Sequence, residues 1–116
     1  MRGGIRLLDK LDVALNATGI PFREGGWDRA PKGDYGVYTL DSAAGSVWAD
    51  GKMREQALEG TIDLFSKSGG VANLNLIQQA INSIDGLSWY LNSIQYENDT
   101  RLMHYEWVFS FVLEVS

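Results

Sequence analysis

The strongest constraint on the fold is a regular alternation of apolar and polar side chains at the end of the chain. In residues 103–114, apolar side chains such as Tyr105, Trp107 and Phe109 occupy every second position and alternate with a second set that includes Glu106 and Ser110. Successive side chains of a β-strand point to opposite faces, so the pattern predicts a strand with one buried face. Such a strand would extend about 45 Å. This length exceeds what one small domain needs to cover its own helices. We therefore expect part of the hairpin that this last strand forms with the preceding strand to contact another molecule.

Period-two patterns also predict earlier strands. Residues 52–65 place Leu58, Gly60, Ile62 and Leu64 on one face. In residues 88–96 we expect Trp89, Leu91 and Ser93 to share a face, with a turn at residues 97–100 leading into the last strand. Asp50-Gly51 is a strong turn signal. The remaining expected segments are short strands at residues 20–24, 35–40 and 46–50, and loops at residues 25–34 and 41–45.

Two segments have the 3.6-residue period of amphipathic helices. The first, residues 5–18, carries Leu8, Leu11 and Leu15, and the second, residues 71–84, carries Leu74, Ile77, Ile81 and Ile84. Gly19 and Gly86 follow these segments where left-handed C-caps are expected. The predicted fold is one α+β domain over residues 1–116, with a mainly antiparallel sheet, two amphipathic helices packed on one face and a long C-terminal β-hairpin.

Composition excludes several classes of function. The chain has no Cys, so it forms neither disulfides nor thiolate metal sites. Its 15 acidic and 10 basic residues give a net charge of −5, which disfavours a protein that grips nucleic acid. The sequence lacks the roughly 18 consecutive apolar residues of a membrane span. Because it also lacks a signal-peptide pattern, we expect synthesis in a cytosol and no membrane partner.

The residues with catalytic potential form no convincing constellation. His104 is the only His and is expected to be solvated or hydrogen-bonded rather than a metal ligand or base. Asp9 with Asp12, and Glu55 with Glu59, have the spacing of exposed charged faces. The pair Gly69-Gly70 precedes a predicted helix but is not followed by the Gly-Lys-Ser/Thr sequence that ends a P-loop. We therefore expect it to be a flexible segment leading into the helix and not a phosphate site. We expect no enzyme activity, no metal and no cofactor.

Aromatic side chains without a core assignment point to interfaces. Trp27 and Trp48 are expected in loops, where partner contact and simple loop packing remain equal alternatives, and Tyr90 and Tyr96 lack core assignments. The candidate subunit or partner interface comprises these four residues and nearby charged ones: Trp27, Asp28, Arg29, Trp48, Asp50, Lys52, Arg54, Tyr90, Tyr96 and Arg101.

The order of these segments resembles the tail terminator, or tail completion, proteins of long-tailed bacteriophages. The resemblance covers nearly the whole chain and rests on pattern and order. It is carried by the helix at residues 7–16, the strands at residues 33–38, 48–51 and 58–65, and the hairpin segments at residues 90–96 and 104–109.

The resemblance implies a subunit of a hexameric ring that caps the tail tube, stops its polymerisation and presents a surface to head connector proteins. It places the protein in the virion at the head-proximal end of the tail, after assembly in the host cytoplasm. Six copies at −5 would carry about −30, so a lumen lined by part of that charge would let DNA pass without specific binding.

Three alternatives remain open. A neck or head-closure protein of the same virion class would bind the portal side instead of tube subunits. A small ligand-binding or enzymatic α+β domain would need a deep polar pocket with a shifted titratable group. A free-standing bacterial adaptor would share the same physics and differ in its genomic neighbours.

Overall fold

The computed structural model describes residues 2–67 and 71–114, and within them the side chains of residues 7–43, 45–67 and 71–114. The predicted pair Gly69-Gly70 therefore lies outside the described residues. The elements follow in the order α1 (Arg2–Asn16), β1 (Phe22–Glu24), β2 (Tyr35–Ala49), β3 (Lys52–Ser66), α2 (Val71–Asn82), β4 (Ser88–Glu97) and β5 (Leu102–Glu114). The protein is α+β, as the sequence predicts.

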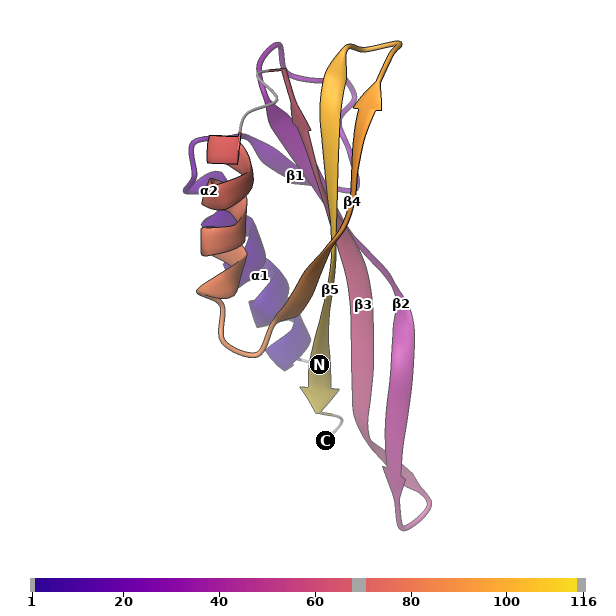
Figure 1. The fold of residues 1–116 in the computed structure, drawn as a ribbon. Helices are drawn as coiled ribbons and strands as arrows, with labels where there is room; N and C mark the ends of the chain where they lie inside the picture. Colours follow the sequence, from indigo (N-terminus) through magenta and orange to yellow (C-terminus); the bar gives the residue numbers. More distant parts are fainter. Residues whose placement is uncertain (1, 68–70, 115–116) are drawn as a thin grey trace.

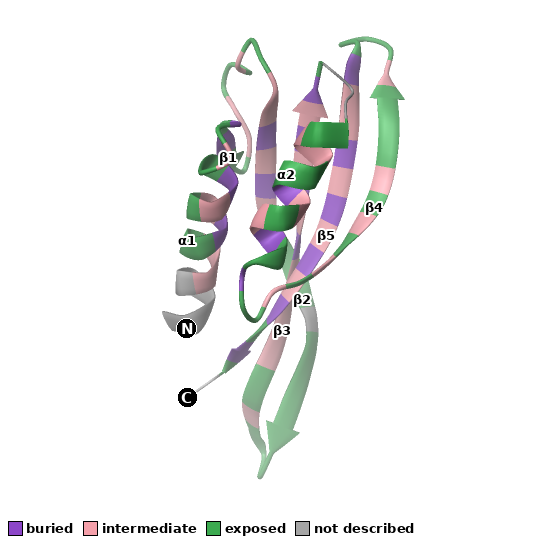
Figure 2. Cartoon of the chain, turned by 60° about the vertical axis from the view of Figure 1, so that its left-hand side comes forward, coloured by how far each residue is buried: buried purple, intermediate pink, exposed green. Residues whose placement is uncertain are grey.

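The five described strands form one sheet in the order β1-β2-β3-β5-β4. The pairing is antiparallel throughout except between β1 and β2, which are parallel. The predicted mainly antiparallel sheet is therefore confirmed. Figures 1 and 2 show α1 and α2 on the same side of this sheet, and α1 lies near β1 and the end of β5.

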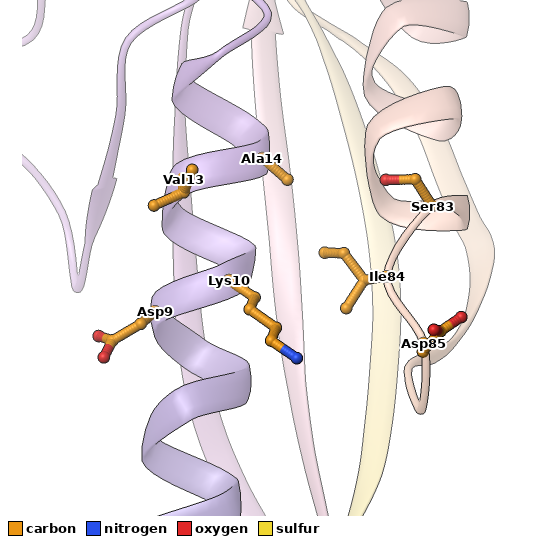
Figure 3. A pocket seen from close by; sticks show the side chains of 7 residues that line it. All are labelled: Asp9, Lys10, Val13, Ala14, Ser83, Ile84 and Asp85. Atoms are coloured by element: carbon orange, nitrogen blue, oxygen red, sulfur yellow. The ribbon is translucent and has the colours of Figure 1, made fainter.

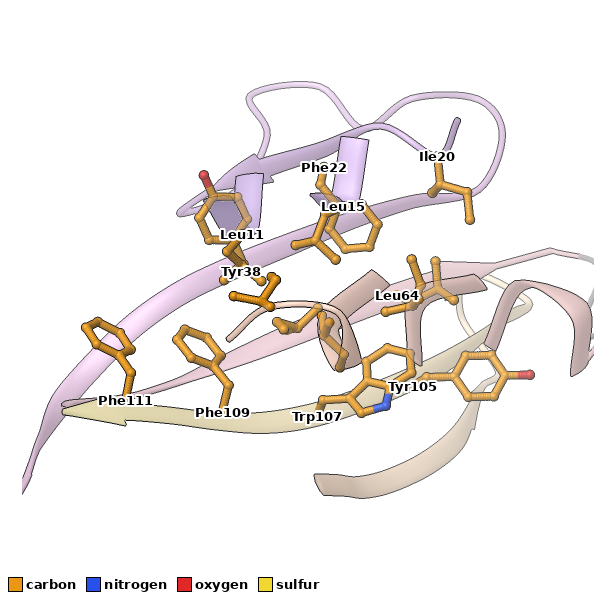
Figure 4. Close-up of a cluster of buried hydrophobic side chains, with 14 residues drawn as sticks. Leu11, Leu15, Ile20, Phe22, Tyr38, Leu64, Tyr105, Trp107, Phe109 and Phe111 are labelled. Atoms are coloured by element: carbon orange, nitrogen blue, oxygen red, sulfur yellow. The ribbon is translucent and has the colours of Figure 1, made fainter. Parts of the chain in front are cut away.

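The core lies between the sheet and the helices. Figure 4 shows Tyr105, Trp107, Phe109 and Phe111 in a row along β5, all within the buried cluster. The alternation predicted for residues 103–114 is confirmed, since these side chains are at most 4% exposed. Leu11 and Leu15 of α1 and Ile77 and Ile81 of α2 pack into the same cluster, as do Ile62 and Leu64 of β3. The apolar faces predicted for the helices and for the strands therefore pack together in a single core.

Polar contacts fix α1 to the sheet. The Tyr38 hydroxyl donates to Asp12 Oδ1 at 2.8 Å, and the Phe22 backbone N–H donates to Asn16 Oδ1 at 2.9 Å. Burial and the hydrogen bond to Asp12 raise the pKa of Tyr38 above its ordinary range, so this hydroxyl remains a donor. Gly19 ends the helical turn with φ of 90°, as predicted for a left-handed cap.

The prediction of a loop at residues 41–45 is wrong. Residues 35–49 form one strand, which joins the short strands predicted at residues 35–40 and 46–50. Trp48 lies in this strand and not in a loop. Small residues suggested a turn here, but pairing with β3 holds the segment extended. Shifts of register between Leu40 and Ser42 and between Ala43 and Gly45 absorb the irregularity as bulges.

The segment that projects from the body is the β2–β3 hairpin. Glu55 of β3 pairs with Val47 on one side and with Glu114 of β5 on the other, and among the described residues the hairpin has only two strands beyond this point. We call residues 48–54 the arm. Figures 1 and 2 show it extending beyond the helices and the end of β5. The extents of 53 × 26 × 25 Å and the 15.4 Å radius of gyration, against about 13 Å for a compact chain of this length, reflect this shape.

This arrangement corrects the expectation that the terminal hairpin is the overlong element. β4 and β5 pair antiparallel around a turn near Arg101, and β5 is flanked by β3 along most of its length. The shared face predicted for Trp89, Leu91 and Ser93 is also wrong. A register shift between Leu91 and Ser93 places Ser93 opposite Glu106, on the other face of the sheet.

Candidate interaction surfaces

The arm gathers four of the predicted interface residues at one end of the molecule. Trp48, Asp50, Lys52 and Arg54 are all exposed, and the Trp48 side chain is 62% exposed. Asp50 and Gly51 form the tip with φ of 54° and 72°, which confirms the predicted turn and matches the type I′ geometry of short hairpins. The arm therefore presents a large aromatic ring and two cations to solvent.

The other predicted residues lie elsewhere. The loop between β1 and β2, which holds Asp28 and Arg29, and the β4–β5 turn, which holds Arg101, are at the end opposite the arm (Figures 1 and 2). Tyr96 lies on β4 near this turn, and Tyr90 lies further along β4; each is 55% exposed. The structure thus separates the predicted interface into two distant groups, with Tyr90 between them.

Trp27 is held by its own chain. Its indole Nε1 donates to the backbone oxygen of Gly36 at 2.9 Å, and the guanidinium carbon of Arg23 lies 5.8 Å from the ring centroid. These contacts correspond to the loop-packing alternative. A partner contact for Trp27 stays a prediction, with only the partly exposed remainder of the ring available to it.

The sheet face opposite the core, which we call the outer face, carries His104 in an aromatic row. The ring centroids of His104 and Phe65 are 4.4 Å apart, and those of Phe65 and Tyr35 are 5.0 Å apart. His104 Nε2 is 2.6 Å from Asp63 Oδ1, and its Nδ1 is 3.6 Å from Glu97 Oε2. The hydrogen-bonded role predicted for His104 is confirmed.

Carboxylates also face one another on the outer face. Asp63 lies directly opposite Glu106, and Glu55 directly opposite Glu114. Like charges in such cross-strand pairs oppose folding. Within the described part of the chain, the ion pairs are those of His104, so no Lys or Arg side chain there offsets these charges through a salt bridge. The outer face therefore favours contact with cations.

The pH dependence of stability tests this environment. Burial raises the pKa of Asp63 above its usual value, and repulsion from Glu106 adds to this, while His104 opposes it. A raised folded-state pKa stabilises the fold below the unfolded pKa, and that contribution is lost as pH rises through the folded pKa. Asp63→Asn removes the titration. We expect the free energy of unfolding of the variant, relative to wild type, to increase as the pH rises from about 4, the ordinary value of an Asp carboxyl, through the raised folded-state pKa.

Urea unfolding of the two proteins at each pH measures this difference. Glu24→Gln is a suitable control, because it also removes one carboxylate and its side chain is exposed. A relative stability of the Asp63→Asn protein that stays constant or decreases over this range contradicts the assignment.

A hollow of about 400 Å³ opens on the outer face beside this acidic region. Small side chains from three strands, those of Ala57, Ser88 and Ser110, leave the space, and the larger Glu59 and Tyr90 border it. The register explains the grouping, because Ser88 pairs with Ser110, which pairs with Glu59. The hollow therefore combines an aromatic wall with a carboxylate.

A second hollow, of about 440 Å³, lies between α1 and the segment after α2. Figure 3 shows Lys10 reaching into the opening, with Ile84 and Asp85 across from it. Val13 at its border is 68% exposed. Among the lining residues there is no Cys or His, and the only hydroxyl, on Ser83, donates to the backbone oxygen of Ala80 at 2.7 Å. This hollow lacks a nucleophile paired with a base.

Asp34 is a polar centre that sequence reasoning missed. Its carboxylate accepts hydrogen bonds from Ser66 Oγ at 2.7 Å, from the Lys67 backbone N–H at 2.8 Å and from the Asn73 side chain. It thereby ties the start of β2 to the end of β3 and to α2. The position of Asp34 directly before a predicted strand was the only local signal, and it gave no indication of these distant donors.

Comparisons with known proteins give no match: no family model matches the chain, and no curated protein resembles it in sequence. Neither described helix combines the length and apolar character required to cross a membrane. Within residues 2–67 and 71–114 there is no group of three or more His, Asp or Glu side chains placed to hold a metal ion.

Proposed function

We propose that this chain is a structural virion protein of a long-tailed bacteriophage. It forms a ring, a hexamer, at the head-proximal end of the tail tube, stops tube polymerisation and joins the tail to head connector proteins. The subunit uses two helices on one sheet face and a long C-terminal hairpin as its body. The proposal assigns it no catalytic step and no cofactor, and assembly takes place in the host cytoplasm.

The observation that carries this proposal is the arm. The Trp48 side chain on this two-stranded projection is left mostly uncovered by its own chain, at 62% exposed, whereas Trp and Arg are the residues that protein interfaces favour. A protein built for assembly supplies that cover from another subunit. A monomeric ligand-binding domain gives no physical reason for the projection.

The charge of the chain is compatible with a ring threaded by DNA. The acids outnumber the bases by five, and part of this excess lies in the cross-strand carboxylate pairs of the outer face. Negative charge facing a lumen repels the phosphate backbone, so the genome passes without adhering.

Tube polymerisation in the presence of this protein tests the proposal. Purified tail tube protein, from the gene neighbouring that of this chain, should form tubes of indefinite length alone and shorter, capped tubes when the protein is added, as measured by electron microscopy. Native mass spectrometry of the capping species should show hexamers. A protein that remains monomeric with tube subunits and leaves tube length unchanged contradicts the proposal.

Two variants sharpen the test. Trp48→Ala should fold normally, because the side chain is exposed, and should fail to cap tubes. Val71→Ala is a control: Val71 is 66% exposed at the start of α2, so its variant should cap as wild type does. Pull-down separates the head-closure alternative, which predicts retention by portal-side connector protein and none by tube protein.

A further inference from the structure

The arm and the outer-face hollow are different surfaces, and every copy of the chain carries both. A contact between two different surfaces joins copies head to tail, which closes into a ring when the rotation between copies permits. The arm is therefore suited to contact a second copy, provided that its chemistry matches that of the hollow.

The apolar parts of the two surfaces match. Trp48 is the large exposed ring of the arm, and the hollow is bordered by Tyr90 and Val108 over a floor of small side chains. Aromatic pairs and a filled apolar hollow stabilise an interface because they remove ring surface from water. A volume of about 400 Å³ accommodates an indole side chain.

The charges match as well. Lys52 and Arg54 are exposed on the arm and form no salt bridge within the described residues. Glu59 borders the hollow, and the opposed pair Glu55 and Glu114 lies further along the same face. Cations placed there relieve the repulsion between carboxylates that face one another across the strands.

Pairing of strand edges is a weaker basis for the contact. Beyond Tyr38, no strand among the described residues pairs with the free side of β2, yet the register of β2 with β3 shifts three times between residues 40 and 48. Bulges of this kind twist an edge and interrupt the row of backbone groups that a new strand needs. Side-chain contacts on the face of the sheet do not depend on such a row.

We propose that Trp48 on the arm of one copy lies in the outer-face hollow of the next copy, with Lys52 and Arg54 facing that copy's Glu59. This inference rests on the proposed ring and specifies the contact that builds it. The hollow is then a subunit-binding site, and the acidic outer face is the surface that recognises the arm.

Charge reversal tests the pairing. An arm variant, Lys52→Glu with Arg54→Glu, and a face variant, Glu59→Lys, should each remain monomeric under conditions where the wild type assembles. Mixed together, they should assemble again, because each arm then meets a face of opposite charge. Lys10→Glu with Lys32→Glu gives the same change of charge as the arm variant at exposed sites away from the arm, and it should assemble as wild type does.

Cross-linking gives a second readout, since the chain has no Cys of its own. With Ala49→Cys on the arm and Ser110→Cys in the hollow, a short flexible bis-maleimide should give a ladder of covalent oligomers. Each single-Cys variant should give no species beyond dimers. Circular dichroism checks that every variant is folded.

The outcomes separate the contact from the function. If the wild type caps tubes as an oligomer but the charge variants also assemble, or the double-Cys protein gives no ladder, this contact is wrong and the proposed function stands. If the wild type never assembles, with or without tube protein, both the proposed contact and the proposed function are wrong. Loss of assembly in the arm and face variants, restored in their mixture, supports the contact.

Discussion

Trp107→Ala is expected to lower the free energy of unfolding by about 3 to 5 kcal/mol. Trp107 is fully buried in the row of aromatic side chains on β5, and its indole Nε1 donates to Gln78 Oε1 of α2 at 3.2 Å. The variant loses the apolar contacts of the ring, leaves a cavity and removes the link to α2. For domains whose total stability is about 5 to 15 kcal/mol, such a loss brings the fold near its limit.

Urea denaturation followed by far-UV circular dichroism measures this loss. Trp48→Ala is the matched control, because it makes the same chemical change at an exposed position and should alter stability by no more than about 0.5 kcal/mol. If Trp107→Ala does not fold, Trp107→Phe keeps most of the buried ring and should cost about 1 to 2 kcal/mol. Equal effects of the Ala substitutions at the two Trp positions would contradict the core described here.

Gly60→Ala is expected to destabilise the protein by about 3 kcal/mol, at the upper end of the range for overpacking. A Cβ at this position would collide with the backbone oxygen of Thr39 on β2, and it would lie 2.6 Å from Phe109 Cζ on β5. The backbone of a paired strand cannot move aside without disturbing the sheet. The added methyl group therefore separates β2 from β3 locally or displaces a buried ring.

Gly45→Ala provides the comparison. Gly45 also lies in a strand, β2, but a Cβ there meets no atom within 4 Å, and its φ lies outside the left-handed region. The substitution should be neutral or stabilise slightly, because Ala restricts the unfolded chain more than Gly does. Thermal unfolding of both variants distinguishes them, and a Gly60→Ala protein as stable as the Gly45→Ala protein would be inconsistent with the close approach of the strands.

The sequence predicted those parts of the fold in which local periodicity and burial agree. Trp107 and Phe109 are inward on β5, and Ile77 and Ile81 are inward on α2, because a single face of each element meets the core. The prediction failed at residues 41–45, where small residues satisfied the pattern of a loop. There the strand is imposed by pairing with β3, and strand formation depends on such neighbours more than on the segment itself.

The candidate surfaces were predictable to a smaller extent. Exposed aromatic residues such as Trp48 and Tyr90 could be recognised because they belong to no predicted apolar face of a helix or strand. The hollow could not, since it arises where small side chains of β3, β4 and β5 come into register. The hydrogen bonds of Asp34 join residues more than thirty positions apart, and a single sequence contains no signal for them.

The two-stranded construction of the arm has a consequence for how subunits would hold one another. In the described part of the chain no third strand flanks residues 48–54, and an isolated hairpin is only marginally stable in water. We therefore expect the arm to open and close locally while the body remains folded. The free energy needed to order the arm makes the free energy of binding between subunits less favourable. Changes at the Asp50-Gly51 turn can thus adjust subunit affinity without altering either contact surface.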